Sequence, residues 1–160
     1  MQDAHSTTVV RPIATGDAKS VRALLDVALG NTPHLAHGVD VVDRALLGGD
    51  REHRALVGTR NRKIVGVACY GDLLGSENVV ELHLVALASP DEREAASELL
   101  RAVDDAARAA GARFVFAELP DDGTLGSTFA SLADAGYREE TRIADYIRDG
   151  VPLVFLRRTL

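Results

Sequence analysis

The stretch VVELHLVALASPDEREAASELLRAVDDAARAAG, which runs from Val79 to Gly111, decides the fold. Its first part, Val79 to Leu87, is mostly apolar and predicts a strand, whereas the part after the turn repeats apolar residues at the spacing of an amphipathic helix. Gly111 is placed to end this helix, because glycine is favoured just after a helix C-terminus. A helix that follows a strand directly presents free N–H groups and a partial positive charge, so the segment is suited to hold a phosphate group.

The start of this helix carries acids where a phosphate-binding loop would carry glycines. Ser89 is expected to cap it, with Pro90 at the first helical position and Glu92 reaching back to the serine N–H, which together form a capping box. The acids from Asp91 to Glu94 complement the helix dipole by about 0.3–1 kcal/mol each, and they repel a phosphate. Two interpretations stay open: a self-sufficient helix cap without a ligand, or a modified phosphate loop whose acids are offset by Arg93 and nearby arginines.

The composition is that of an ordinary globular domain, with 160 residues, 46% of them apolar and 26% charged. This length predicts a single domain over residues 1–160, and the polar start predicts a flexible leader over residues 1–8. The formal net charge of −6 and the scarcity of aromatic residues argue against nucleic acid as a partner.

Several features point to a cytoplasmic protein. No stretch approaches the ~20 apolar residues of a membrane span, so no membrane partner is expected. The N-terminus lacks a signal-peptide core. Cys69 is the single cysteine and lies in the apolar run IVGVACY, so it is expected to be a buried structural thiol with no disulfide within the chain.

The remaining sequence predicts a mixed sheet with helices on both faces. In chain order, the further elements are a strand over Val9–Ile13, a helix capped by Asp17, a loop over residues 30–38, a short helix capped by Asp40, a hairpin of Ala55–Thr59 and Lys63–Tyr70, a strand over Ala112–Glu118, a helix over Thr124–Ala135, and two strands joined at Asp149-Gly150. The unit from Val79 to Glu118 is a strand–helix–strand crossover between parallel strands. The rest is hairpin-connected, so the fold class is α+β, with a mostly antiparallel sheet and one parallel pair.

This order of elements resembles the GNAT acyltransferase superfamily over nearly the whole chain. The segments ELHLVALASPDE (81–92), FASLADAGYRE (129–139) and RIADYIRDGVPLVFLRRTL (142–160) carry the resemblance, together with VVRPI and the helix after it. The resemblance implies a GNAT-like fold and transfer of an acyl group, usually acetyl, from coenzyme A to a primary amine of a small molecule or peptide. It also implies acetyl-CoA as cosubstrate and no metal. Homodimers are common in the resembled family, and no sequence feature decides the oligomeric state.

The pyrophosphate loop of the resembled family reads Arg/Gln-x-x-Gly-x-Gly/Ala, and this chain departs from it. With Arg93 in the Arg position, the glycine positions fall on Ala96 and Glu98; aligned on the leucine pair of the helix instead, they fall on Glu94 and Ala96. The loop is therefore a degenerate version of the family pattern. The resemblance assigns cofactor contacts to Leu87, whose N–H would face the oxyanion, and to Arg93, Ala95 and Ala96.

Glu81 and His83 are the candidate catalytic residues. Strand alternation predicts that they share a face with Val79 and Val85. Either side chain suits a base that takes a proton from the acceptor ammonium, and Glu81 stands where many members of the resembled family carry an acid that acts through water. The alternative interpretation is a solvated polar pair at a strand edge.

The general acid and a metal site have weaker candidates. The tyrosine that often serves as acid in the resembled family falls on Leu132, which cannot donate a proton. Tyr137 is interpreted as a core residue, and Tyr70 and Tyr146 are the candidate replacements. His34 and His37 share a loop that would border the acceptor, and no carboxylate or cysteine nearby completes a metal site with them.

Two functions therefore compete. The first is an acyl-CoA-dependent N-acyltransferase with Glu81 or His83 as base. The second is a catalytically inactive GNAT-fold binding or regulatory protein that has lost normal coenzyme A binding, which the loop and Leu132 favour. An enzyme of this fold with another cofactor, or none, is a third possibility. The acceptor cannot be read from the sequence.

Overall fold

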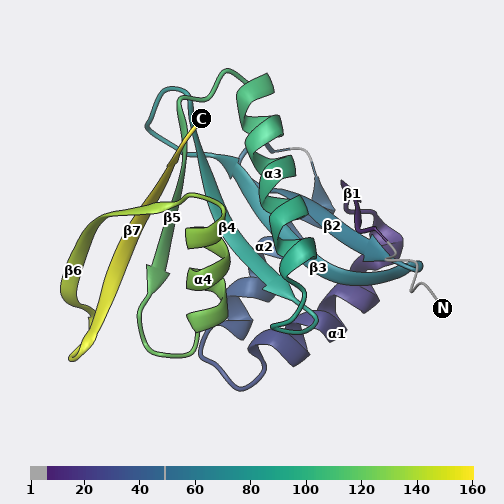
Figure 1. The fold of residues 1–160 in the computed structure, drawn as a ribbon, viewed down its shortest axis with the longest axis horizontal. Helices are drawn as coiled ribbons and strands as arrows, with labels where there is room; N and C mark the ends of the chain where they lie inside the picture. Colours follow the sequence, from purple (N-terminus) through teal and green to yellow (C-terminus); the bar gives the residue numbers. More distant parts are fainter. Residues whose placement is uncertain (1–6, 49) are drawn as a thin grey trace.

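The computed structural model describes residues 7–48 and 50–160 of the chain. Within these residues the chain forms a single sheet with α-helices on both of its faces (Figure 1). The elements are β1 (Val9–Pro12), the 3-10 helix η1 (Thr15–Asp17), α1 (Ala18–Leu29), α2 (Leu35–Leu47), β2 (Arg54–Arg60), β3 (Lys63–Asp72), β4 (Val79–Leu87), α3 (Arg93–Ala109), β5 (Phe114–Pro120), α4 (Gly126–Asp134), β6 (Arg138–Arg148) and β7 (Val151–Thr159). No helix among the described residues is long and apolar enough to cross a membrane.

The strands are ordered β1-β2-β3-β4-β5-β7-β6 across the sheet. Every neighbouring pair is antiparallel except β4 and β5, which are parallel and joined through α3. The predicted fold class, α+β with one parallel pair, is confirmed. The turn at Asn61 and Arg62, both with positive φ, closes the predicted β2–β3 hairpin.

The hydrophobic core lies in two layers, one on each side of the sheet. Leu99, Leu100 and Val103 of α3 pack with Leu132 of α4 on one face, and Figure 1 shows these helices in front of the sheet. On the other face, α1 and α2 pack on β2, β3 and β4. Cys69 belongs to this second layer, where burial raises the pKa of its thiol to about 12. The prediction that it is a buried structural thiol is confirmed.

A β-bulge at His83 changes which side chains of β4 share a face. Cys69 of β3 pairs with Leu84 and Tyr70 pairs with Leu82, so β4 carries one extra residue at this point. Beyond the bulge, the alternation of side chains between the two faces is therefore shifted by one residue. Val85 joins Leu82 in the α3 layer, whereas Leu84 lies in the α1–α2 layer. The strict alternation that placed Val85 with Glu81 and His83 is wrong, because a bulge resets the period-two pattern.

Strands β4 and β5 separate soon after they pair. Their parallel ladder covers Val79–Glu81 and Phe114–Phe116, and it ends there, although both strands continue. Strand β5 goes on pairing with β7 as far as Pro120, and β4 goes on pairing with β3 as far as Leu87. The sheet therefore opens between the carboxyl ends of its two central strands.

Two local predictions at the N-terminal side need correction. Helix α2 begins at Leu35, before the predicted cap at Asp40, so His37 lies in a helix and His34 at its N-cap position. Of the predicted leader, residues 1–6 lie outside the described residues. Thr8 is buried and donates its N–H to Glu94 Oε1 at 3.0 Å, so it is fixed to the start of α3.

Candidate active site

The opening between β4 and β5 holds a groove made of three cavities. The strand cavity, about 340 Å³, lies between the two strands; the central cavity, about 130 Å³, lies beside it; and the helix cavity, about 400 Å³, lies between α3 and α4. The strand and central cavities share Val85 and Thr128 as walls, and the central and helix cavities share Pro90 and Ser127. The shared walls make one path from the strands to the N-terminus of α3.

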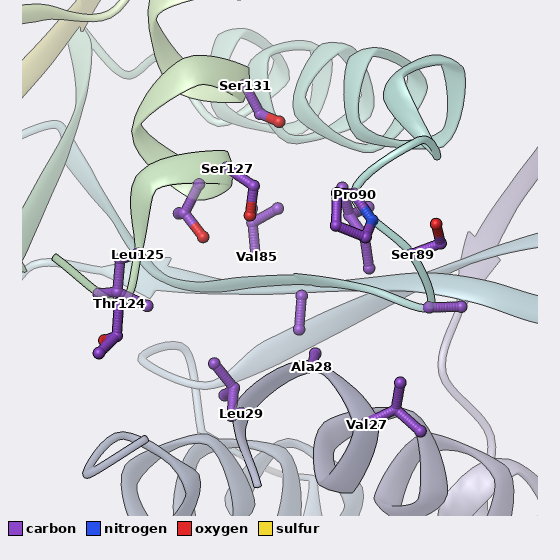
Figure 2. Close-up of a pocket in the computed structure, with 14 residues that line it drawn as sticks. Val27, Ala28, Leu29, Val85, Ser89, Pro90, Thr124, Leu125, Ser127 and Ser131 are labelled. Atoms are coloured by element: carbon purple, nitrogen blue, oxygen red, sulfur yellow. The ribbon is translucent and has the colours of Figure 1, made fainter. Parts of the chain in front are cut away.

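The central cavity is the narrow middle of this path. Figure 2 shows Ser127 and Ser131 of α4 on one side of it, Pro90 on another, and Ala28 and Leu29 of α1 beyond the strand. The passage thus reaches from one face of the sheet to the other where the two strands have separated. Its walls are mainly apolar, with serine and threonine hydroxyls from α4.

Glu81 and His83, the two candidate bases named from the sequence, both line the strand cavity. The Nε2 of His83 lies 2.7 Å from the backbone carbonyl oxygen of Glu52, and a carbonyl only accepts, so Nε2 carries the hydrogen. The Nδ1 atom lies 3.7 Å from Oε1 of Glu81, and the ring stacks on His53 with centroids 5.2 Å apart. His83 is therefore held on three sides.

A glycine makes this arrangement possible. A Cβ added to Gly71 of β3 would overlap the backbone carbonyl of Glu52. Only glycine lets the segment before β2 lie so close to the sheet that its carbonyl reaches His83. His83 is consequently oriented by a contact between segments that neither strand pattern predicted.

These contacts also shift the pKa of His83. Burial favours the neutral imidazole, but hydrogen bonds to Glu81 and the Glu52 carbonyl, with the charges of Glu81 and Asp50, outweigh it and raise the pKa of His83. His83 is a partner that orients the Glu81 carboxylate. Of the two predicted bases, His83 has Nε2 engaged by the Glu52 carbonyl and Nδ1 near Glu81, so these contacts favour Glu81 as the candidate base.

Glu118 is a site residue that the sequence reasoning missed. It lies on β5 and lines the strand cavity together with Glu81. Partial burial and the nearby charge of Glu81 raise the pKa of Glu118, and His83 opposes that shift. The run ARFVFAE predicted a strand buried on both faces, and this pattern gave no indication that its final acid lines a cavity. The available signal was an acid near the end of a strand that runs parallel to the strand carrying Glu81.

The backbone of Leu87 faces the opening, as its predicted role requires. The N–H of Ala88 donates to the Val65 carbonyl of β3 at 2.9 Å. Because successive residues of a strand point their N–H groups to opposite sides, the N–H of Leu87 points away from β3. The ladder with β5 has already ended at Glu81, so this N–H is directed into the groove, where Leu87 lines the central cavity.

The start of α3 differs from the predicted capping box. The helix begins at Arg93, and the Ser89 hydroxyl accepts the N–H of Asp91 at 3.2 Å. The Glu92 carboxylate does not turn back to Ser89, because Arg60 of β2 binds it at 2.7 Å. Glu94 is likewise drawn aside, toward Thr8.

Pairing with Arg60 and Thr8 changes the charge at this helix end. Two of the three acids that would repel a phosphate are engaged at the β1–β2 edge and do not line the helix cavity. Arg93 and Ala96 do line it, with Asp91 and Asp134 as the acids on its wall. Ala95 is fully buried and lines none of the three cavities, so any contact it makes to a ligand would come from its backbone.

The helix cavity fits a phosphate-bearing chain in its donor set. It combines the N-terminus of a 17-residue helix with the Arg93 guanidinium and the hydroxyls of Ser97, Ser127 and Ser131. The small side chain at Ala96 leaves room where the resembled family has a glycine. Asp91 and Asp134 are the unfavourable elements of the same wall.

The candidate acids are placed as follows. Leu132 is buried in the core, so no proton donor stands at that position. Tyr70 and Tyr137 are buried and Tyr146 is 61% exposed on β6; in the described part of the chain none of them lines the three cavities. Hydroxyls of α4, from Ser127 to Ser131, line the central cavity instead.

The two histidines of the predicted loop reach the site from α2. His34 and His37 line the strand cavity, and His37 Nε2 lies 3.3 Å from the backbone carbonyl of His83. Both histidines therefore share a cavity with Glu81 and His83. Within residues 7–48 and 50–160, no group of three or more His, Cys, Asp or Glu side chains is arranged to hold a metal ion.

Solved structures similar to this chain share its architecture. A protein of Desulfovibrio desulfuricans described as an acetyltransferase of the GNAT family superposes with a TM-score of 0.84 at 24% identity, covering 96% of this chain and 99% of its own. YncA of Salmonella typhimurium, solved with acetyl-CoA, gives 0.73 at 16% identity, covering 96% and 94%. The ribosomal-protein-S18-alanine N-acetyltransferase of Escherichia coli gives 0.71 at 15% identity, with the same coverage.

These likenesses, together with the strand order and the parallel β4–β5 pair, show that the chain has the GNAT-like fold. No protein-family model and no curated protein matches the chain in sequence. The fold is therefore established by structure.

Proposed function

We propose that this protein is an acyl-CoA-dependent N-acyltransferase that uses acetyl-CoA and acts on a primary amine of a small molecule or peptide. The observation that carries the proposal is the groove. It runs from the N-terminus of α3 to the gap between β4 and β5, where Glu81 and the Leu87 N–H meet it from β4. A base and an N–H donor on one strand are what aminolysis of a thioester needs.

In this proposal, acetyl-CoA when bound supplies the activated acetyl group, and the chain's own residues arrange the reaction. Glu81 accepts the proton of the acceptor ammonium, directly or through a water molecule. His83, held by the Glu52 carbonyl, orients Glu81. The Leu87 N–H would stabilise the charge that develops on the acyl oxygen, and the α4 hydroxyls of the central cavity would be the donors available to the departing thiolate.

The helix cavity is the proposed place of the pyrophosphate. Arg93 and the first N–H groups of α3 would hold it, and the engagement of Glu92 by Arg60 keeps that carboxylate away. The bound acetyl-CoA in the Salmonella relative supports this type of ligand for the fold. For this chain, the proposal of acetyl-CoA as ligand depends on the hydrogen-bond donors that line the helix cavity.

A specific observation favours the second candidate, a GNAT-fold binding or regulatory protein without normal coenzyme A binding. Asp91 and Asp134 line the helix cavity, and Leu132 occupies the position of the customary acid. Both features weaken a cofactor site and a proton relay. They leave the strand cavity intact, so an amine-binding protein without turnover is the form this alternative takes.

Thermal unfolding with acetyl-, propionyl- and succinyl-CoA separates the two. A ligand at 100 times its dissociation constant stabilises the folded state by about 2.7 kcal/mol, so a clear rise in Tm is expected. Arg93→Ala should reduce the rise, whereas Arg101→Ala is the matched control, because Arg101 lies on the same helix but pairs with Glu98 and Asp105 away from the cavity. No rise with any of the three would refute the acyltransferase proposal.

A further inference from the structure

His34 lines the strand cavity and pairs with Asp122, a residue outside the cavity lining. His34 Nε2 lies 2.8 Å from Asp122 Oδ2, although the residues are 88 positions apart. The side chains are 17% and 4% exposed, respectively, so the pair is largely shielded from water. It joins the N-terminus of α2 to the loop between β5 and α4, and His34 is on the same cavity wall as Glu81.

Asp122 is fixed in place from its other oxygen. Oδ1 accepts the backbone N–H of Thr124 at 2.9 Å and the Thr124 hydroxyl at 2.6 Å. Burial would raise the pKa of Asp122, but these hydrogen bonds and His34 outweigh it and lower that pKa. Asp122 is therefore a carboxylate that only accepts, and Nε2 of His34 must carry the hydrogen.

The tautomer of His34 follows from this contact. When the ring is neutral, its lone pair is on Nδ1. Among the described residues, no hydrogen-bond partner faces Nδ1. His83 differs, because its Nε2 donates to a carbonyl and its Nδ1 faces Glu81. His37 differs too, since its Nε2 contacts the His83 carbonyl.

We propose that His34 is a second proton acceptor for the amine in the strand cavity, with Asp122 as its positioning residue. The inference rests on the proposed acyltransferase function. Glu81 takes the first proton of the acceptor ammonium. Once the nitrogen has bonded to the acyl carbon, a second N–H bond breaks, its proton binds His34 Nδ1, and the nitrogen keeps the electron pair as the amide forms and the thiolate leaves. Asp122 balances the imidazolium charge, and the proton then passes to solvent.

The surroundings of His34 agree with this step. The titratable groups that line the cavity with it are Glu81 and His83 from β4, Glu118 from β5, and His37 from α2. The two glutamates attract an ammonium into the cavity from the strand side, and His34 lies on the helix side. An amine between them therefore meets a proton acceptor on either side.

The test replaces His34 with glutamine and compares it with Arg44→Gln, an exposed position on α2 that pairs with Asp40 and lines none of the three cavities. The amide of the introduced glutamine can still donate to Asp122 but takes no proton. We expect His34→Gln to lower kcat/KM for amine acetylation by about 100-fold, a typical general-base contribution. The pH profile of kcat/KM should change while the Tm shift with acetyl-CoA stays. Arg44→Gln should stay within about twofold, since it removes no group from the cavity.

Two further variants test the roles of Asp122 and His34 independently of His34→Gln. Asp122→Asn should also lower kcat/KM, because it removes the charge that stabilises the imidazolium. His34→Asn places a favoured residue at the N-cap position of α2, so it serves if His34→Gln fails to fold. A folded His34 variant with turnover within about twofold of wild type and an unchanged pH profile would overturn the proposal and leave a structural pair. A wild-type protein that acetylates no amine would overturn the proposed function as well.

Discussion

The two ends of the groove are built by different means. At the strand cavity, charged side chains are held by partners distant in sequence, such as His83 by the Glu52 carbonyl and His34 by Asp122. At the helix cavity, the features are a helix N-terminus, one arginine and two acids on the same wall. The proposed reaction end is therefore specified by tertiary contacts, whereas the proposed cofactor end relies on the N-terminus of α3 and on the pairing of Glu92 and Glu94 with residues outside the cavity.

The largest expected effect comes from breaking the reaction end at Glu81. Glu81→Gln removes the base, so kcat should fall by about 10²–10⁴-fold with little change in the Tm shift caused by acetyl-CoA. Steady-state kinetics with thiol detection measures it. Glu118→Gln is the companion variant, with a smaller loss in kcat and a larger rise in KM. Equal turnover of Glu81→Gln and wild type would remove the base assignment.

A second break at the same end acts through the backbone. In Gly71→Ala the new Cβ overlaps the Glu52 carbonyl, so the segment must move and His83 loses its partner. We expect a loss of about 1–3 kcal/mol of unfolding free energy, in the range of overpacked sites, with a drop in kcat. Gly16→Ala is the control, since a Cβ there meets nothing within 4 Å. Urea unfolding measures the unfolding free energy of both variants. Equal losses in Gly71→Ala and Gly16→Ala would contradict the requirement for glycine at position 71.

At the helix cavity, replacing an acid on the wall should strengthen acetyl-CoA binding. Asp91→Asn and Asp134→Asn should each tighten acetyl-CoA binding by about two- to fivefold, which corresponds to 0.3–1 kcal/mol for a charge near a helix end. Calorimetric titration at low salt gives the affinities. Asp105→Asn, on the exposed face of α3 beside Arg108, is the matched control. Weaker binding in both variants would mean that these acids support the ligand.

Arg60→Ala tests whether the ion pair between Arg60 and Glu92 influences acetyl-CoA binding. It frees the Glu92 carboxylate near the start of α3, so acetyl-CoA affinity should fall by a similar few-fold, about the helix-end charge effect. Stability should fall by about 1 kcal/mol or less, as for partly exposed ion pairs. Raising the salt concentration should narrow the difference between variant and wild type. An affinity equal to wild type at low salt would show that Glu92 does not influence the cavity.

The smallest expected effect is a pH dependence of stability from His83. Its pKa is raised in the folded protein, so the folded state binds the proton more tightly than the unfolded chain does. That stabilisation is fully present below the unfolded pKa and is lost as the pH rises through the folded pKa. The difference in unfolding free energy between wild type and His83→Gln should therefore be larger at acidic than at alkaline pH. Urea titrations at both pH values test the sign.

Much of the fold could be predicted from local patterns. The strand–turn–helix from Val79 to Gly111 shows clear periodicity, and the order of the elements gave the sheet and its parallel pair. The start of α2 was missed because Gly38 resembles a breaker. In the structure Gly38 is buried in α2, and a Cβ there would come 3.0 Å from Leu29 Cδ1, so the glycine serves close packing of α1 and α2.

The candidate site was predicted in part. Glu81 and His83 were named from the strand pattern, and both line the strand cavity. Glu118 was missed as a site residue, since it ends an apolar strand, and Asp122 was interpreted as part of a turn. Their position in the site depends on where β4 and β5 separate and on where α2 begins, which no local pattern encodes.

The sequence by itself determined the succession of elements, the apolar faces of the helices, the acidic start of α3 and the lack of a tyrosine at Leu132. Only the tertiary structure decided which partner each charge takes: Arg60 for Glu92, the Glu52 carbonyl for His83, and Asp122 for His34. It also decided the bulge that resets the faces of β4. The reason is physical, because periodicity reports the average burial of a local segment, whereas these contacts join segments that meet only when the sheet and its two helical layers are assembled.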